Sequence, residues 1–359
     1  MSLKEIAEKA GVSVSTVSRV ISDKDSKAAS KQVKERIWSI VRETGYVPDT
    51  NAQHLRMRGS TSKKPVNNKY YACVYARNQD NKDMFFSQLA ASIEYEAYKS
   101  DYILKYSFFA NDVDDQSFTN AINSKEISGV VILGRFGQDR IDAIANTKKN
   151  VVYVGLNFST DSHDVVYCDG LKASHMAMSE LYELGHREIA YLGEIRKESR
   201  YKGYIEFSHS HDIKTGKELV VDTSQTLEGG YRGACELLRR GADFSAIFCA
   251  NDETAMGAIK GLWDKGIKVP EDVSVISIDD IEMARYFTPM LTTVHIPIDE
   301  LGRHTAKTLI DRIEKGHTLP VKIELPFTLS RRDSCAPKKR GSGPASKNKE
   351  ASVYKGYKQ

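Results

Sequence analysis

From Tyr70 onward the sequence alternates between short apolar runs and longer amphipathic segments, and this alternation restricts the possible fold more than any other feature. The apolar runs have the length of β-strands and no polar face, which is typical of a parallel sheet covered by helices on both sides. The alternation starts again near residue 172. We therefore predict an α/β core of two doubly wound lobes, each built on a parallel sheet. The predicted strands are 71–76, 103–106, 129–133, 151–154, 188–192, 219–221, 246–249, 273–278, 291–294 and 322–329, and the predicted helices are 85–99, 113–124, 138–147, 172–184, 198–208, 229–240, 254–265 and 299–315.

The first 44 residues show a different pattern, that of three short helices that must share one small core to be stable. Gly11 tolerates the positive φ that often follows a helix, and Ser13 and Ser30 can cap the helices after them. The polar face of the second helix carries hydroxyl groups and Arg19, which suit phosphate oxygens and base edges in the major groove of DNA. We predict a helix-turn-helix module, although any amphipathic helical hairpin also has a polar face. The predicted helices are 3–10, 14–20 and 31–44.

A linker is predicted between residues 47 and 69. Pro48 disfavours helix at the residue before it, and the segment 51–58 has too little apolar surface to fold alone. We expect this segment to become a hinge helix only when it docks on DNA and on its copy in a second subunit, with Leu55 as a wedge in the minor groove. A plain flexible linker is the alternative. The predicted division is a DNA-binding domain at 1–46, a hinge and linker at 47–69, a two-lobed core at 70–332 and a basic, disordered tail at 333–359.

Composition and motif spacing argue against several classes of protein. The net charge of +4 is modest, but basic residues gather just after the helical module and at the start of the tail, where they can hold polyanions. The five cysteines are scattered with no CxxC pair, so neither a zinc site nor a disulfide framework is predicted. No apolar run is long enough to span a bilayer, and we expect a cytoplasmic protein with no membrane partner, no metal and no cofactor.

Polar residues follow several of the predicted strands and indicate a ligand site. Ligands of open α/β sheets bind beyond the carboxyl ends of the strands, and in two facing lobes these ends line one cleft. Carboxylates, amides and arginines bind sugar hydroxyls, while an aromatic ring covers the apolar face of a sugar. Each polar residue could instead cap a helix, and for Asp252 and Asp280 capping is at least as well supported. The strand-end residues are Asn78, Asp80, Arg135, Asn157, Asp169, Asn251, Asp252, Asp279 and Asp280, and the aromatic residues among them are Phe85, Phe86, Phe136 and Phe158.

Evidence for catalysis is weak, and we expect no enzymatic activity. The sequence holds no GxSxG, HExxH or P-loop motif. An enzyme that acts on a sugar, with Asp279 and Asp252 as acid and base, is one alternative. A sugar-binding protein whose helical module binds another protein is a second. We interpret His186 and Cys249 as structural residues.

Seven short segments of the sequence, which lie between residues 4 and 294, resemble motifs of the lactose/galactose repressor family of bacterial transcription factors. The resemblance covers nearly all of residues 3–332. The core of that family is similar to a periplasmic sugar-binding protein, in agreement with the two predicted lobes. The stretch 278–289 is most similar to galactoside-responsive members. No leucine heptads follow Arg332, so the tetramerising tail of some relatives is not visible. The motifs that carry the resemblance are residues 4–20, 45–48, 183–187, 250–252, 266–270, 274–280 and 289–294.

The resemblance implies a homodimeric, allosteric repressor that binds operator DNA under the control of a small sugar between the lobes. It places Val14, Ser15 and Arg19 at base-reading positions, and it places Arg200, Asn251 and Asp279 on the sugar. The predicted DNA-binding residues are Ser13, Val14, Ser15, Thr16, Ser18, Arg19, Ser30, Tyr46 and Leu55, and the predicted sugar-binding residues are Phe86, Arg135, Asp169, Arg200, Asn251 and Asp279.

Overall fold

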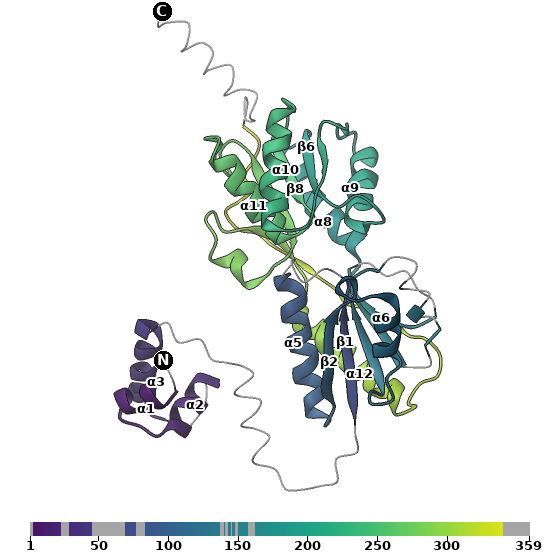
Figure 1. The fold of residues 1–359 in the computed structure, drawn as a ribbon. Coiled ribbons are helices and arrows are strands. Elements are labelled where there is room, and N and C mark those ends of the chain that lie inside the picture. The colour runs from purple at the N-terminus through teal and green to yellow at the C-terminus, as the bar shows by residue number, and fades with distance from the viewer. Residues whose placement is uncertain are drawn as a thin grey trace, which may run out of the picture. The chain divides into compact units, whose positions relative to one another are not determined.

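The computed structural model divides the chain into two compact units, Met1–Asn67 and Asn68–Gln359 (Figure 1). The predicted hinge helix, Leu55 and Tyr46 lie outside the described residues, as does most of the predicted helix 138–147. The residues that the structure describes are 3–22, 29–44, 69–76, 83–136, 140, 143–144, 146–147, 150–156 and 162–339.

The N-terminal unit contains the three predicted helices, α1 (Leu3–Ala10), α2 (Val14–Ser22) and α3 (Lys31–Thr44). Ser13 caps α2, because its Oγ accepts a hydrogen bond from the Thr16 backbone N–H at 3.2 Å. The core of this unit is made of small and branched apolar residues that are fully or almost fully buried, which confirms the predicted shared core. These residues are Ile6, Ala7, Ala10, Val17, Val20, Ile37 and Val41.

The first lobe of the C-terminal unit is a six-stranded parallel sheet in the order β11-β5-β4-β3-β1-β2. Side chains that alternate along β1 enter two different cores, Tyr71 and Cys73 on one face and Ala72 and Val74 on the other. Helices α5 and α12 pack together on the first face, and α6 covers the other (Figure 1). The elements are β1 (Tyr70–Tyr75), α5 (Met84–Lys99), β2 (Ile103–Phe109), α6 (Asp115–Ile122), β3 (Gly129–Leu133), β4 (Asn150–Gly155), β5 (Asp164–Tyr167), α12 (Ile298–Ile313) and β11 (Lys322–Glu324).

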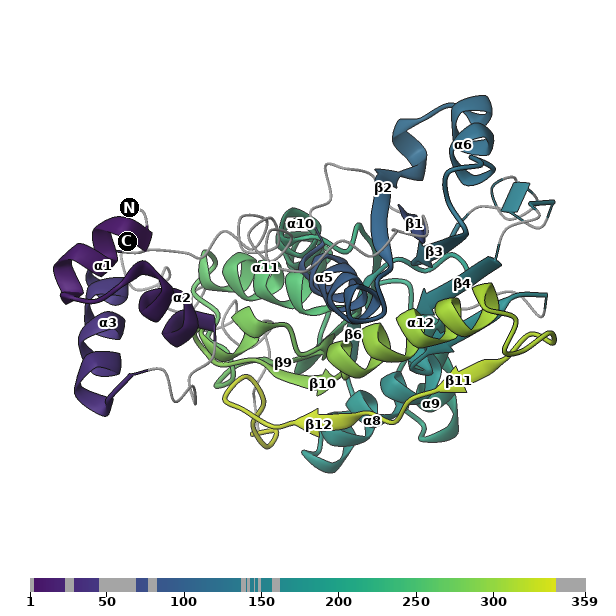
Figure 2. The same ribbon diagram turned by 90° about the horizontal axis from the view of Figure 1, so that it is seen from below.

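The second lobe has a six-stranded sheet in the order β12-β10-β9-β8-β6-β7, parallel except for β12. Helix α8 packs against α9, and α10 against α11, on opposite faces of the sheet (Figure 2). Two doubly wound lobes are therefore confirmed. The elements are α8 (Gly170–Glu183), β6 (Ile189–Gly193), α9 (Ser199–Ser210), β7 (Val220–Asp222), α10 (Leu227–Arg239), β8 (Ala246–Cys249), α11 (Asp252–Trp263), β9 (Ser274–Asp279), β10 (Thr292–His295) and β12 (Thr328–Ser330).

The chain passes between the lobes three times: after β5, after β10 and between β11 and β12. The prediction of one strand over 322–329 is therefore wrong, because β11 and β12 belong to different sheets. Pro326 lies between them and has no backbone N–H to donate to a sheet, which separates the two short strands. The short strand β5 was not predicted.

A disordered tail was predicted from residue 333 onward, but residues 333–338 are part of the folded core. Ser334 is fully buried, where its Oγ accepts a hydrogen bond from Thr292 N at 2.8 Å and donates one to the Val275 carbonyl at 2.6 Å. The backbone N–H of Lys338 donates to the Leu184 carbonyl at 2.8 Å. Residues 333–338 thus hold α8, β9 and β10 together. In the described part of the chain no helix is both long and apolar enough to cross a membrane.

Candidate functional site

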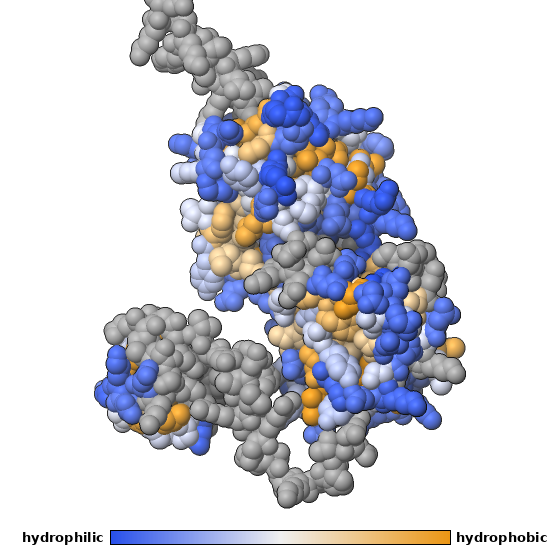
Figure 3. Space-filling model, in the orientation of Figure 1, coloured by the Kyte–Doolittle hydropathy of each residue, from blue (hydrophilic) through white to orange (hydrophobic). Residues whose placement is uncertain are grey.

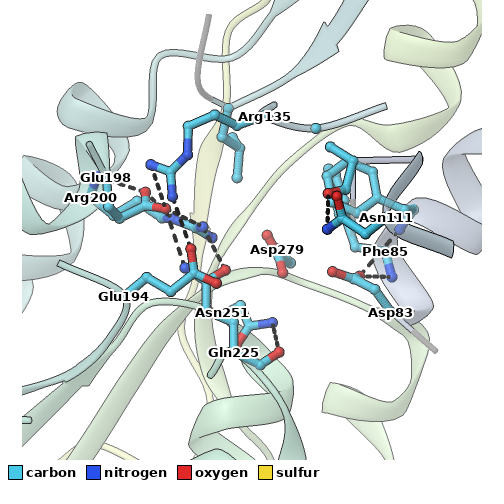
Figure 4. Close-up of a pocket in the computed structure, with 14 residues that line it drawn as sticks. Asp83, Phe85, Asn111, Arg135, Glu194, Glu198, Arg200, Gln225, Asn251 and Asp279 are labelled. Carbon is cyan, nitrogen blue, oxygen red and sulfur yellow. Dashed lines mark hydrogen bonds and ion pairs between the residues drawn. The ribbon is translucent and has the colours of Figure 1, made fainter. Parts of the chain in front are cut away.

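A cavity of about 220 Å³ lies between the two lobes, beyond the carboxyl ends of strands of both sheets (Figure 4). Five of the six predicted sugar-binding residues line it, namely Phe86, Arg135, Arg200, Asn251 and Asp279. The first lobe contributes Ala76, Asp83, Phe85, Phe86, Asn111, Gly134, Arg135 and Leu156, and the second contributes Glu194, Glu198, Arg200, Gln225, Asn251 and Asp279.

Asp169, the sixth predicted residue, is not among the residues that line the cavity. Its side chain caps α8 by accepting hydrogen bonds from the Leu171 and Lys172 backbone N–H groups, at 2.9 and 3.2 Å. The alternative of helix capping therefore accounts for Asp169. Three other strand-end residues, Asn78, Asp80 and Asn157, lie outside the described residues.

Arg200 and Glu198 form a buried, bidentate ion pair in the wall of the cavity. The Arg200 Nε lies 2.8 Å from Glu198 Oε1, and its Nη2 lies 3.1 Å from Oε2. The guanidinium also donates to the Ala250 carbonyl at 2.9 Å and to Gln225 Oε1 at 2.7 Å. Burial alone would raise the pKa of Glu198, but the charge and hydrogen bonds of Arg200 outweigh burial and hold that pKa at about 2. Glu198 is therefore ionised, and Arg200 is fixed in one orientation.

Arg135 reaches across the cavity from the loop after β3 to the second lobe. Its Nη2 lies 2.9 Å from Glu194 Oε2, and its Nη1 donates to the Lys197 carbonyl. The same Nη1 lies 3.8 Å from Glu198 Oε2. Glu198 is thus placed between an arginine of its own lobe and an arginine of the other lobe (Figure 4).

The start of α5 forms the opposite wall. Asp83 caps this helix by accepting hydrogen bonds from the backbone N–H groups of Phe85 and Phe86, at 3.0 and 3.3 Å. The two phenyl rings meet edge to face, with ring centroids 5.2 Å apart. Next to them, the Met84 N–H donates to Glu253 Oε1 at 2.9 Å, which is a second polar contact between the lobes. This wall offers an apolar ring surface beside polar groups.

Asp279 ends β9 in the middle of the cavity (Figure 4). Its φ is 134° and that of Asp280 is 55°, values that are uncommon for residues other than glycine. This turn separates the two carboxylates: Asp279 lines the cavity, whereas Asp280 bonds to Ser330 at 2.9 Å and to Arg332 at 2.6 Å. Capping is thus the wrong interpretation for Asp280.

Asn251 caps α11 and lines the cavity as well. Its Oδ1 accepts hydrogen bonds from the N–H and hydroxyl of Thr254, at 3.1 and 2.5 Å, and its Nδ2 donates to the Gln225 carbonyl at 3.2 Å. Asn251 therefore serves as a helix cap and also faces the cavity where a ligand would bind. Because Asn251 is the cap of α11, the interpretation of Asp252 as the cap of this helix is wrong.

Asp252 lies behind the cavity wall. Its carboxylate accepts hydrogen bonds from the hydroxyls of Ser277 and Thr293 and from the Ile281 N–H, at 2.5, 2.6 and 2.8 Å. It does not line the cavity with Asp279, so the two residues proposed as an acid and base pair are not brought to one site. His186 and Cys249 are buried, as predicted of structural residues, and His186 bonds to the Ser245 hydroxyl at 2.9 Å.

The predicted DNA-reading face lies on α2. Arg19 and Ser15 are exposed, Thr16 is half-buried, and the apolar Val14 packs partly on the three-helix core. The Ser13 hydroxyl, which was predicted to contact the DNA backbone, caps the helix and lies 2.9 Å from Thr16 Oγ1. Ser30 is exposed just before α3; the side chain of Ser18 lies outside the described part of the chain.

Sequence reasoning missed five polar residues of the cavity, namely Asp83, Asn111, Glu194, Glu198 and Gln225. Four of them lie in segments between strands and helices, and Asn111 lies in a single turn of 3-10 helix after β2; at such places a polar residue is also expected as a cap or a turn. Glu198 could have been found only from its position directly before α9, two residues from Arg200.

Comparison with known proteins agrees with this architecture. Residues 2–49 match the family model of bacterial regulatory proteins of the lacI family, and residues 178–335 match that of the periplasmic binding protein-like domain. The transcriptional repressor MelR of Bacillus subtilis is 28% identical over 343 residues, which cover 93% of this chain and 97% of MelR.

Solved structures match the fold over most of the chain. A complex of the transcriptional regulator CelR with cellobiose is 26% identical, with a TM-score of 0.69, over 93% of this chain and 99% of the other. A lacI-family regulator from Enterococcus faecium with bound ribose is 28% identical, with a TM-score of 0.64, over 75% of this chain and 100% of the other.

A helix-turn-helix module followed by a two-lobed core with a polar cavity between the lobes defines a class of bacterial transcription regulators. Residues 2–49 carry the DNA-binding domain of the lacI family and residues 178–335 a periplasmic binding protein-like domain, and the homologues of the chain are lacI-family repressors, in agreement with the resemblance of its motifs.

The buried position of Asp252 predicts a dependence of stability on pH. Burial raises its pKa from 3.8 to about 7, so between these values the folded state holds a proton that the unfolded state has lost. Because the unfolded state then binds fewer protons, the free energy of unfolding should fall as the pH rises through this range. Asp252→Asn should remove this part of the slope in urea unfolding measured at several pH values.

Asp243→Asn is the matched control, because Asp243 is exposed in the same lobe. It should leave the slope as in the unmodified chain. An unchanged slope in the Asp252 variant would show that Asp252 is charged throughout this range.

Proposed function

We propose that this protein is a DNA-binding transcriptional repressor whose affinity for its operator is controlled by a small sugar bound between the core lobes. One observation carries the proposal: a polar cavity with an aromatic wall lies between two lobes of the same chain that holds a helix-turn-helix module. A ligand in the cavity would hold the two lobes together. To regulate transcription, it would also have to change the affinity of the helix-turn-helix module for DNA.

The chemistry of the cavity supports a sugar as the ligand. Carboxylate, amide and guanidinium groups converge on a small space, and they are the groups that hydrogen-bond to adjacent hydroxyls. Phe85 and Phe86 supply an apolar surface for the C–H face of a sugar ring. CelR is described with cellobiose and the E. faecium regulator with ribose, which are both sugars. The galactoside specificity indicated by residues 278–289 stays a prediction.

Control of DNA binding requires that the sugar prefer one arrangement of the lobes. Two interlobe contacts, Arg135 with Glu194 and the Met84 N–H with Glu253, lie at the cavity, so a ligand there acts directly on the lobe contacts. We infer that the shift reaches the DNA through the first lobes of a dimer and the hinge segments before them. Leu55 would act as the minor-groove wedge of each hinge.

An exposed apolar surface on the second lobe supports a homodimer. Figure 3 shows apolar residues gathered on the side of this lobe where α11 lies. Trp263 is 69% exposed and Tyr286 is 74% exposed, and Trp263 lines one shallow hollow with Met290, Ile259 and Phe287. A contiguous exposed apolar surface marks an interaction site. On the first lobe, Tyr95 of α5 is exposed as well. We assign this surface, defined by Trp263, Met283, Tyr286 and Met290, to contact with a second copy of the chain.

Arg19→Ala should weaken operator binding by about 1–3 kcal/mol if Arg19 reads a base. The operator is first selected from random-sequence DNA, and binding is then measured by gel shift at matched salt concentrations. Lys9→Ala removes an equal charge from α1 and reports the nonspecific share of the loss. Equal loss in both variants, or no selected sequence at all, would contradict base reading and favour a module that binds protein.

Removal of Arg200 should abolish the response to sugar. Because Arg200→Ala alone leaves Glu198 buried without its partner, the variant carries Glu198→Gln as well. A sugar that raises the melting temperature of the unmodified chain should no longer do so in this variant, and operator release by that sugar should be lost. Arg232→Ala, on the exposed face of α10, is the control. A double variant that still responds would place the sugar elsewhere.

Trp263→Glu should convert the dimer to monomer, because it puts a charge into the apolar contact. Sedimentation equilibrium measures the mass directly. Leu319→Glu is the matched control, since Leu319 is 76% exposed but lies on the first lobe after α12. A monomeric unmodified chain, or a dimer that survives Trp263→Glu, would contradict the assigned interface.

A further inference from the structure

We propose that the interlobe cavity accepts an uncharged sugar and excludes phosphorylated and carboxylated sugars, and that Glu198 sets this selectivity. The proposal rests on the proposed function, because it names the chemical class of the effector bound at the same site. It is derived from the charges in the cavity wall and from the way in which they are already paired.

Helix geometry alone would make this cavity attractive to anions. Three helices, α5, α9 and α11, begin at the cavity, and their capping residues Asp83, Glu198 and Asn251 all line it. Helix N-termini carry partial positive charge and free N–H groups, and they commonly bind phosphate or carboxylate. Here two of the three caps are carboxylates that belong to the protein. The positions an anion would take at α5 and α9 are therefore occupied.

The charged side chains of the wall are also unfavourable for an anion. Four carboxylates line the cavity, Asp83, Glu194, Glu198 and Asp279, against two arginines, Arg135 and Arg200. Each arginine already contacts a carboxylate, at 2.9 Å for Arg135 with Glu194 and 2.8 Å for Arg200 with Glu198. A phosphate would have to displace one of these carboxylates and then lie beside it, and like charges in such contact are strongly unfavourable.

Glu198 has the central place among these groups. Its side chain is 1% exposed, it pairs with Arg200 in its own lobe, and it lies 3.8 Å from Arg135 of the other lobe. Gln225 Nε2 donates to it at 3.2 Å, so a neutral group holds the same carboxylate in position. Its pKa of about 2, held low against the effect of burial by the charge of Arg200, keeps it charged at neutral pH. Without this charge, the Arg200 guanidinium and the start of α9 would face the cavity with no carboxylate between them, while Arg135 would keep its contact with Glu194.

An uncharged sugar fits the same wall. Arg200 and Arg135, oriented by their carboxylate partners, can each give a remaining N–H to a hydroxyl oxygen, and carboxylates accept hydroxyl hydrogens. No charge has to be displaced or left uncompensated, because each carboxylate of the pairs keeps its arginine.

Calorimetric titration of the full chain with matched pairs of sugars tests the proposal. The probes are ribose and ribose 5-phosphate, glucose with glucose 6-phosphate and glucuronate, galactose and galactose 6-phosphate, and cellobiose and cellobiose 6′-phosphate. In the pair whose uncharged member binds, the anionic member should bind at least about tenfold more weakly. Glu198→Gln should reduce the ratio of the affinity for the uncharged sugar to the affinity for the anionic sugar by about tenfold or more, chiefly by strengthening the binding of the anion.

Glu206→Gln is the matched control, because Glu206 is an exposed carboxylate on the same helix, α9. Its ratio should equal that of the unmodified chain. Melting curves establish that each variant is folded, and if Glu198→Gln does not fold, Glu198→Asp takes its place and should retain the exclusion.

The possible results separate the inference from the proposed function. Binding of an anionic sugar as tight as that of its uncharged partner, by the unmodified chain, would overturn the inference and leave a sugar-controlled repressor intact. An unchanged ratio in the folded Glu198→Gln variant would overturn the role of Glu198. Failure of every sugar to bind would overturn both the inference and the proposed function.

Discussion

The site depends on one topological constraint, which is that parallel strands in a sheet all end at the same edge. Each strand must be followed by a crossover, so the loops that begin the next helices gather beyond the carboxyl ends of the strands. In this protein two such edges face one cavity, because the chain passes between the lobes three times. Side chains far apart in sequence, such as Asp83 and Asp279, therefore meet in a space of about 220 Å³.

The strands and helices could be predicted because burial leaves a periodic pattern in the sequence. Alternate residues of β1 enter two separate cores, so the strand is apolar throughout, and this pattern identified most of the sheet. The same pattern misled at 322–329, where two strands of different sheets follow each other across Pro326. Periodicity reports that a segment is buried, but it does not report which neighbour buries it.

The candidate site was predicted only in part, for a related reason. Asp169 and Asn251 each follow a strand and cap the next helix, yet only Asn251 lines the cavity. The difference lies in the order of strands in each sheet: Asp169 follows β5, which lies next to the edge strand β11, whereas Asn251 follows β8, which lies between β9 and β6 inside its sheet. That order is fixed by pairing between distant segments. The same is true of Ser334, whose burial depends on contacts with β9 and β10.

The third passage of the chain between the lobes, from β11 to β12, affects when the lobes can fold during synthesis. The first lobe needs α12 and β11, and the second needs β12 and residues 333–338, which all come from the end of the folded chain. On the ribosome, therefore, the first lobe is not complete until β11 has been made, and the second not until residues 333–338 have been made. Until α12 has been made, the sheet face that it covers stays open to water, and such apolar surface on a nascent chain is what chaperones bind. The three N-terminal helices have their own core and need not wait.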